Sequence, residues 1–293
     1  MISANVIEDS VSPAGARVVT LELQYHRYFH GELLTHRVLS RNSASSRAIP
    51  VRKMLAQVEE NPAEPCRWPT NQPGMQGGEE LGSSKREEAR LVWQRAAGHA
   101  AYFAEALMSL GVHKSIPNRL LEPFQWMRTI VTATEWDGFF ALRDHSAALP
   151  EFQLLAKAMR KAMDASTPSL RTGELDDIFA WHLPYVSLQE RIDSQAAKVP
   201  AWVLIACSAA RCARVSYLTH DGENPSIQKD LDLFMRLVGS EPLHASPIEH
   251  QATPLITNYT PSRNFRGWLQ FRELFEDSQA LRDLYPTLKE AYA

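Results

Sequence analysis

The densest group of polar and cationic side chains in the sequence is HRVLSRNSASSRAIP, residues 36–50. It holds three arginines, one histidine, one asparagine and four serines in fifteen positions. Arginine side chains, serine hydroxyls and backbone N–H groups are the donors with which proteins bind phosphate and other anions. The stretch therefore predicts either a local site for a phosphate-bearing ligand or an ordinary solvated basic surface.

Two further stretches are dense in residue types that can do chemistry. Residues 118–143 place three arginines among large aromatic side chains, and residues 243–254 carry a Glu–His pair after Ser–Pro. The aromatic residues have helical spacing, which is more typical of core than of a ligand platform, and surface arginine ion pairs are common and weak. Glu249 and His250 alone are compatible with an acid–base or a hydrogen-bonding pair.

Composition limits the class of protein. At 293 residues, with 44% hydrophobic and 22% charged residues, the chain can bury a full core in one large domain or two modest ones. The net charge of −3 argues against general binding to nucleic acid, which rests on excess Lys and Arg. We therefore expect a local basic site and no nucleic-acid partner.

Targeting signals and metal motifs are weak. Residues 1–16 contain acidic side chains and no apolar core of signal-peptide length, and no run approaches the roughly 20 apolar residues of a membrane span. We expect a cytoplasmic protein with no membrane partner. The three cysteines cannot all pair, and Cys207 and Cys212 lack the usual zinc spacing, so we predict buried free thiols and no metal site.

Hydrophobic periodicity predicts helices with a few strands. Alternation over 16–25 indicates a half-buried strand with one face made of Val19, Leu21, Leu23 and Tyr25. Fourfold spacing over 26–39 favours a helix that runs into the basic stretch. Further helices are predicted from a capping box at Ser84 to Gly111, over 150–163 with Pro at its entrance, and over 227–239. Their predicted apolar positions are Leu91, Val92, Ala96, Phe103 and Leu107 in the first, and Phe152, Leu155, Met159 and Met163 in the second.

The segment 59–82 is rich in Pro and Gly and is too long for a plain connector. Trp68, Asn71 and Gln72 could stack on or hydrogen-bond to a planar ligand. The segment is therefore predicted to be either a lid over a binding site or a solvated surface excursion.

The stretch HRVLSRNSASSR resembles the signature of flavin-dependent thymidylate synthases, in which a His–Arg is followed by a Ser, an Asn, a second Ser and an Arg at fixed offsets. The matching residues, within 36–47, are His36, Arg37, Ser40, Asn42, Ser45 and Arg47. ATEWDGFFALR followed by PEFQLLA resembles the later helix pair of the family, with its Leu–Arg at Leu142–Arg143, and NRLLEP resembles its Ala–Arg helix, which makes Arg119 the match. The resemblance implies one domain over 1–293 with an α+β fold, helix-rich with a small, mainly antiparallel sheet.

The order of the motifs differs from that family. ARVSY (213–217), the helix 227–238 and SPIEH (246–250) resemble family motifs that precede the signature, but here they follow it, within 207–258. This order indicates a circular permutation, which proteins tolerate when the original termini lie close together.

The resemblance also implies a chemistry. Family members are transferases in which reduced flavin carries a one-carbon unit from methylenetetrahydrofolate to C5 of dUMP, and NADPH supplies the electrons. Arg143 would be the catalytic residue, stabilising charge on the pyrimidine. The implied substrate-binding residues are Ser45, Arg47 and Arg119, with Glu32 and Ser43 at altered positions. The implied flavin-binding residues are His36, Arg37, Ser40, Asn42, Glu249 and His250. The expected cofactors are FAD and NADPH, and the expected assembly is a homotetramer with shared sites.

Several positions depart from the family pattern and keep alternatives open. Thr35 stands where the family has Arg, Ser43 where it has Glu, and Glu32 where it often has Gln; Thr132 and Gly138 replace asparagines near the flavin. These changes leave room for hydroxymethylation of dUMP or modification of dCMP on the same scaffold. A non-catalytic nucleotide or nucleic-acid binding module that uses only the basic loop is the remaining alternative.

Overall fold

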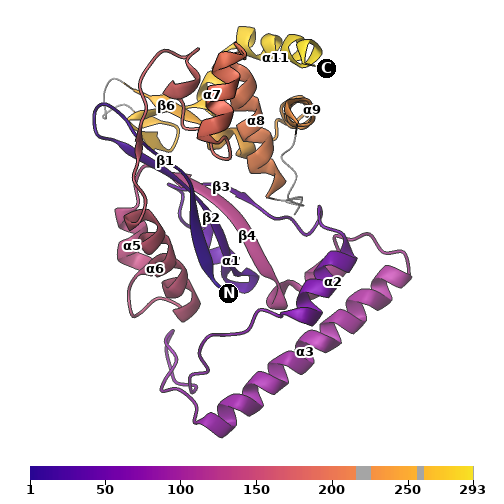
Figure 1. Cartoon of the computed structure of the whole chain (residues 1–293). Helices are drawn as coiled ribbons and strands as arrows, with labels where there is room; N and C mark the ends of the chain where they lie inside the picture. The colour runs from indigo at the N-terminus through magenta and orange to yellow at the C-terminus, as the bar shows by residue number, and fades with distance from the viewer. Residues whose placement is uncertain (216–225, 256–260, 293) are drawn as a thin grey trace.

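The computed structural model describes residues 1–215, 226–255 and 261–292 (Figure 1). Its centre is a five-stranded sheet in the order β3-β4-β2-β1-β5. The strands are β1 (Ser3–Val11), β2 (Arg17–His26), β3 (Ser40–Ser43), β4 (Trp126–Ala133) and β5 (Ser169–Leu170). All neighbours pair antiparallel except β1 with β5, so the helix-rich α+β fold with a small, mainly antiparallel sheet is confirmed.

The strand β2 is buried on both of its faces. The predicted face of Val19, Leu21, Leu23 and Tyr25 packs into the larger hydrophobic core, as alternation requires. The opposite face carries Val18 and Thr20, which contact the C-terminal part of the chain at Trp268 and His182. The part of β2 from Val18 to Leu21 therefore lies between two packed layers, while Glu22 and Gln24 further along the strand are half-buried.

The helix α6 (Pro150–Asp164) covers one face of the sheet by packing on β1 and β2, beside α5 (Asp137–Arg143) (Figure 1). Its first residue is proline, which is tolerated there because the first N–H groups of a helix have no intrahelical partner. All four apolar side chains predicted for it are buried, so this helix is as predicted.

The long helix α3 (Ser83–Ser109) lies away from the sheet and packs on α2 (Val51–Glu60) (Figure 1). Its predicted start is confirmed, but the N-cap is Gly82 with no side-chain bond, so the predicted capping box is wrong. Only the small side chains of Ala97, Ala101 and Ala104 are buried, whereas Leu91, Val92 and Phe103 are exposed, so the predicted apolar face is also wrong. Alanine is buried because α2 approaches α3 closely along this line.

The stretch 26–39 does not form the predicted long helix. It contains a 3-10 turn, η1 (Arg27–Phe29), and one helical turn, α1 (His30–Leu33), before the chain turns into β3. Ser40–Ser43 pairs instead with 129–132 of β4. Cross-strand pairing thus overrides the local periodicity, and the signature lies partly on a strand.

The C-terminal part has a second hydrophobic cluster around α8 (Ala201–Arg214). The other helices there are α7 (Leu188–Ala196), α9 (Ile227–Val238), α10 (Phe271–Asp277) and α11 (Gln279–Ala291). Two short antiparallel pairs join β6 (Ala252–Pro254) to β9 (Trp268–Gln270) and β7 (Pro261–Ser262) to β8 (Phe265–Arg266). The remaining short elements are α4 (Pro117–Leu120), η2 (Glu122–Phe124), η3 (Ile178–Ala180) and η4 (Ser246–Glu249).

The predicted helix 227–239 is confirmed as α9, whose first turn is capped by the Ser226 side chain and which ends before Gly239. Ser216 and Tyr217 of the ARVSY motif lie outside the described residues. All three cysteines are free, but only Cys207 and Cys212 are buried; Cys66 is exposed, so its predicted burial is wrong. Within the described ranges, every helix is too short or too polar to cross a membrane.

Candidate functional site

A cavity of about 720 Å³ lies where the signature meets the chain after α3 and the C-terminal part. Its described lining consists of Asn42, Ser43, Ser45, Arg47, Ala48, His113, Lys114, Ala213 and His244. This lining holds two permanent cations, Arg47 and Lys114, and no carboxylate among the described residues. We call it the cationic cavity. Such a surface favours an anionic ligand.

The loop after β3 is held in place by buried hydrogen bonds from α4. Asn118 donates through Nδ2 to the carbonyls of Ser46 and Ile49, at 2.8 and 2.9 Å. The Ser46 hydroxyl donates to Glu122 at 2.8 Å, and Lys114 Nζ donates to the Ala48 carbonyl at 2.9 Å. The backbone that carries Ser45 and Arg47 is therefore fixed before any ligand arrives.

Asn42 forms a wall of the cationic cavity. Its Nδ2 donates to the Cys212 carbonyl at 2.7 Å, and its Oδ1 accepts from the Ser246 hydroxyl at 3.3 Å. Asn42 thus joins β3 to α8 and η4. Its contribution to the site is to fix the wall, since its amide is already engaged.

The exposed cation of the cationic cavity is Arg47. The structure records no ion pair for its guanidinium with any described residue, while its backbone N–H donates to Ser45 Oγ at 3.3 Å. Ser43 is held from behind by Thr129, whose hydroxyl donates to it at 3.0 Å. Arg47 is therefore the lining side chain most free to bind a ligand.

Three predicted site residues meet in a separate cluster. Arg143 donates through Nε to His36 Nε2 at 2.8 Å and through Nη1 to Glu32 at 2.9 Å, and its guanidinium lies 4.4 Å from the centre of the Phe152 ring. Burial, then the positive charge of Arg143, lowers the pKa of His36 to about 4. Because Arg143 can only donate, the neutral His36 ring carries its proton on Nδ1. The cluster thus joins the predicted catalytic residue Arg143, the predicted substrate-binding residue Glu32 and the predicted flavin-binding residue His36. None of the three is in the described lining of the cationic cavity.

Arg37 and Arg119 are both exposed. Arg119 lies 3.8 Å from Glu122 with 66% of its side chain exposed, and it is absent from the described lining of the cationic cavity. The roles predicted for these two arginines stay predictions.

Ser40 and Glu249 meet through Gln270. The Gln270 amide donates to the Ser40 hydroxyl at 3.1 Å and to the Glu249 carbonyl at 2.9 Å. The Glu249 carboxylate pairs with Arg272, and burial raises its pKa. Both residues are engaged inside the protein, which ties the late SPIEH motif to the signature.

His250 is fully buried behind β4. Its Nδ1 lies 2.8 Å from the Thr132 hydroxyl, and burial lowers its pKa to about 3. Its Nε2 has no hydrogen-bond partner in the described part of the chain. The preceding turn, η4, packs against β3, so SPIEH and the signature are neighbours in space despite their separation in sequence.

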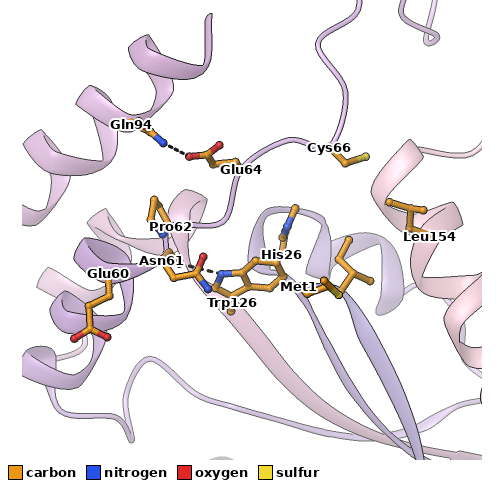
Figure 2. Close-up of a pocket in the computed structure, with 11 residues that line it drawn as sticks. Met1, His26, Glu60, Asn61, Pro62, Glu64, Cys66, Gln94, Trp126 and Leu154 are labelled. Atoms are coloured by element: carbon orange, nitrogen blue, oxygen red, sulfur yellow. Dashed lines mark hydrogen bonds between the residues drawn. The ribbon is translucent and has the colours of Figure 1, made fainter. Parts of the chain in front are cut away.

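A second cavity, of about 670 Å³, has the opposite character (Figure 2). Trp126 donates to the Asn61 carbonyl at 3.0 Å, and Gln94 donates to Glu64 at 2.6 Å. Its described lining contains Glu60 and Glu64 but neither Lys nor Arg. We call it the acidic cavity.

The segment predicted as a lid, 59–82, contributes side chains to the acidic cavity and none to the described lining of the cationic cavity. Within it, the Trp68 ring packs edge-to-face on the Trp93 ring, with 6.2 Å between the ring centres, and the Trp68 backbone N–H donates to the Glu80 carboxylate at 2.9 Å. In this chain the segment therefore lies beside the acidic cavity, and its role as a lid stays a prediction.

Sequence reasoning missed three ionisable residues of the cationic cavity: His113, Lys114 and His244. The one local signal was Gly111, which lies just after the end of α3 and precedes His113 and Lys114 by two and three residues. Nothing in the local pattern shows that this turn folds against the signature.

No protein-family model matches the chain, and no curated protein matches it. Among solved structures, it is similar to the UMP/dUMP methylase PolB from Streptomyces cacaoi. The form bound with 5-Br dUMP is 15% identical with a TM-score of 0.46, over 56% of this chain and 90% of that chain. The form bound with 5-Br UMP is 16% identical with a TM-score of 0.46, over 56% and 88%. A likeness this weak assigns neither fold nor function, so the functional assignment rests on residues of this chain.

Proposed function

We propose that the protein is a transferase that binds the phosphate of a pyrimidine deoxynucleotide in the cationic cavity and moves a one-carbon unit from methylenetetrahydrofolate to C5 of the base. NADPH would supply the two electrons that reduce this unit to the methyl group, so that dUMP is converted to dTMP. The observation that carries the proposal is the composition of this cavity. Four signature residues line it, and two cations face it without a carboxylate among the described lining residues. Its volume of about 720 Å³ is within the usual range for small-molecule sites.

Arg47 and Lys114 supply the charge that a phosphate needs. Arg47 offers a planar fork that suits two phosphate oxygens, while Lys114 offers a compact ammonium already oriented by its bond to the Ala48 carbonyl. The Ser45 hydroxyl adds a neutral donor beside them. The fixed loop lowers the entropic cost of binding, because these groups need little rearrangement.

The flavin implied by the family resemblance does not fit the residues that the structure describes within one chain. A bound flavin supplies the redox and one-carbon carrier chemistry of that reaction. Of the six residues implied for it, only Asn42 lines the cationic cavity, and its amide is already engaged. His36 and Glu249 are likewise held by Arg143 and Arg272.

We propose instead that a flavin site is completed between copies of the chain, in a homotetramer. The exposed apolar side chains on α3 support an assembly, since monomeric soluble proteins rarely expose so many large apolar side chains on one helix. These are Leu91, Val92, Tyr102 and Phe103. Arg143, fixed by Glu32 and His36, would then stabilise negative charge on the pyrimidine of a neighbouring site.

The test is incubation of the purified protein with dUMP or dCMP, methylenetetrahydrofolate, FAD and NADPH, followed by mass analysis of the nucleotide. A gain of one methyl group on dUMP supports the proposal. A hydroxymethyl product, or modification of dCMP alone, supports the alternative suggested by Thr35, Ser43 and Glu32. Nucleotide binding without any product, together with no flavin absorbance on the protein after unbound FAD has been removed, leaves only a binding module.

A further inference from the structure

A hydrogen-bonded chain of side chains crosses the central sheet. It passes in order through Arg171, Ser10, His182, Thr20, Thr132 and His250. The successive distances are 3.1, 2.9, 2.7, 2.7 and 2.8 Å. Ser10, Thr20 and Thr132 stand on the adjacent strands β1, β2 and β4. We call this set the cross-sheet chain.

Water does not reach the cross-sheet chain. All five members other than Arg171 have 0% exposure. A buried donor or acceptor without a partner costs about 1–3 kcal/mol, so the hydrogens of the cross-sheet chain will be arranged to leave as few donor and acceptor groups unpaired as the atoms allow.

Arg171 sets the direction of these hydrogens at one end. Its Nε–H can only donate, so Ser10 Oγ accepts from it. The one other recorded partner of the Ser10 hydroxyl in the described chain is His182 Nδ1. The Ser10 hydrogen is therefore paired only when it points to His182. If the chain ran in the reverse direction, both the Ser10 hydrogen and the His250 Nε2 lone pair would be unpaired, whereas this direction leaves only the His250 Nε2–H unpaired, so His182 Nδ1 is the acceptor.

The directions of the remaining hydrogen bonds follow because each neutral imidazole ring and each hydroxyl has one hydrogen to donate. Burial lowers the pKa of His182 well below its ordinary value, so its neutral ring places its proton on Nε2 and donates to Thr20. Thr20 then donates to Thr132, and Thr132 donates to His250 Nδ1. His250 is neutral as well, because burial lowers its pKa to about 3, and its proton is left on Nε2.

We propose that Arg171 and the cross-sheet chain fix His250 as the Nε2–H tautomer, so that His250 presents a directed hydrogen-bond donor to an acceptor atom on the heterocycle of a bound ligand. Ser10 and His182 are positioning residues in this arrangement, since they act through His250. The unpartnered Nε2 is the atom that such an acceptor would satisfy. It is fully buried and lines neither the cationic nor the acidic cavity as described, so the ligand reaches it only when binding rearranges the residues around it. The identity of the ligand rests on the proposed function, whereas the tautomer does not.

The tautomer is measured directly by long-range ¹H–¹⁵N NMR correlation on protein labelled at histidine nitrogen. His250→Gln and His182→Gln serve only to assign the two rings. We expect both rings in the unsubstituted protein to be neutral and protonated at Nε2 at pH 7. A His250 ring protonated at Nδ1, or averaged between tautomers, overturns the inference without any further variant.

Ser10→Ala tests whether the direction is set at the far end. It removes the hydroxyl that orients His182, so the ¹⁵N shifts of His182 and His250 should move towards averaged values. Ser12→Ala is the matched control, because Ser12 directly follows the same strand and is also buried, and the one recorded hydrogen bond of its hydroxyl within the described residues is from the Ala16 N–H. Unchanged tautomers in a folded Ser10→Ala protein overturn the role of Arg171 and Ser10. If Ser10→Ala does not fold, Thr20→Val interrupts the same chain and is judged by the same signals.

The ligand part is tested by adding dUMP and FAD separately to the labelled protein. We expect one of them to shift the His250 Nε2–H proton resonance. If calorimetry shows binding but this resonance is unmoved, the donor role is overturned and the proposed function stands. If neither compound binds, the proposed function and the donor role both fall, while the tautomer result stands by itself.

Discussion

The cationic cavity and the cross-sheet chain use polar side chains in opposite ways. In the cavity, the guanidinium of Arg47 is exposed and has no recorded ion pair within the described chain. In the cross-sheet chain, each of the four inner side chains, Ser10, His182, Thr20 and Thr132, is fully buried and hydrogen-bonded to two other members. Polar groups that lack an internal partner are available to a ligand, whereas paired buried groups hold the fold. The two regions should therefore respond differently to substitution, pH and salt.

The largest expected effect separates binding from stability. In Arg47→Ala/Lys114→Ala, two charge-assisted bonds to phosphate are lost, each worth about 1.5–3 kcal/mol, so the affinity for dUMP should fall by at least about a hundredfold. Calorimetry with dUMP measures it. Arg52→Ala is the control, since Arg52 is also exposed but lies outside the described cavity lining. If the double variant and the control bound dUMP with equal affinity, the assignment of the phosphate to the cationic cavity would be wrong.

The next effect belongs to the cross-sheet chain and depends on pH. The folded pKa of His250 is about 3, below the value of about 6.5 in an unfolded chain. Between these two values the unfolded state binds more protons, so stability is fully present above the unfolded pKa and falls as the pH is lowered. At pH 5 this histidine alone should cost about 2 kcal/mol of the free energy of unfolding, and His182 adds to it.

Urea unfolding between pH 7.5 and pH 5 measures this slope. His250→Gln should reduce the slope because it removes one titrating group. His99→Gln should leave it unchanged, since His99 is exposed. An identical slope in all three proteins would contradict the burial of a neutral His250.

A smaller effect is expected when one link of the chain is removed without a change of shape. Thr20→Val deletes a hydroxyl bonded to both Thr132 and His182, so the free energy of unfolding should fall by about 2 kcal/mol. The affinity for dUMP should fall far less than in Arg47→Ala/Lys114→Ala, because Thr20 does not line the cationic cavity and can affect a ligand only through His250. A loss of affinity equal to that of Arg47→Ala would show that the two regions are not separate.

The smallest effect concerns Glu32→Gln. The pair of Arg143 with Glu32 is partly exposed, with 43% of the glutamate side chain accessible, and such pairs contribute less than about 1 kcal/mol. Thermal unfolding should therefore shift little, and added salt should reduce the difference further. If the free energy of unfolding fell by several kcal/mol, the cluster of Arg143, Glu32 and His36 would contribute to stability as much as the cross-sheet chain does.

The sequence predicted those parts of the fold that depend on local periodicity. Three features were predicted correctly: the alternation of β2, the apolar face of α6 and the end of α9 before Gly239. Each depends on residues close together in the sequence, because one buried face fixes the first two and one glycine fixes the third. The helix predicted over 26–39 failed since Ser40–Ser43 pairs with β4, nearly ninety residues later. No local pattern carries that partnership.

The site divides in the same way. The anion donors Ser45 and Arg47 were identified by residue type and density, whereas Lys114 required knowledge of which turn packs against them. His182 gave no signal at all, because a histidine inside an apolar stretch is usually only a core residue. Its function depends on two threonines on different strands, and that arrangement is visible only in three dimensions.

The burial of both faces of β2 has a consequence for synthesis on the ribosome. Thr20 and Thr132 are translated well before their partners, since 162 residues separate Thr20 from His182 and 118 separate Thr132 from His250. During that interval one face of the nascent sheet has no protein cover, and its hydroxyls are bonded to water. The sheet thus reaches its final form only after most of the chain has emerged, so a stalled or truncated product would present an open polar stripe to chaperones and proteases.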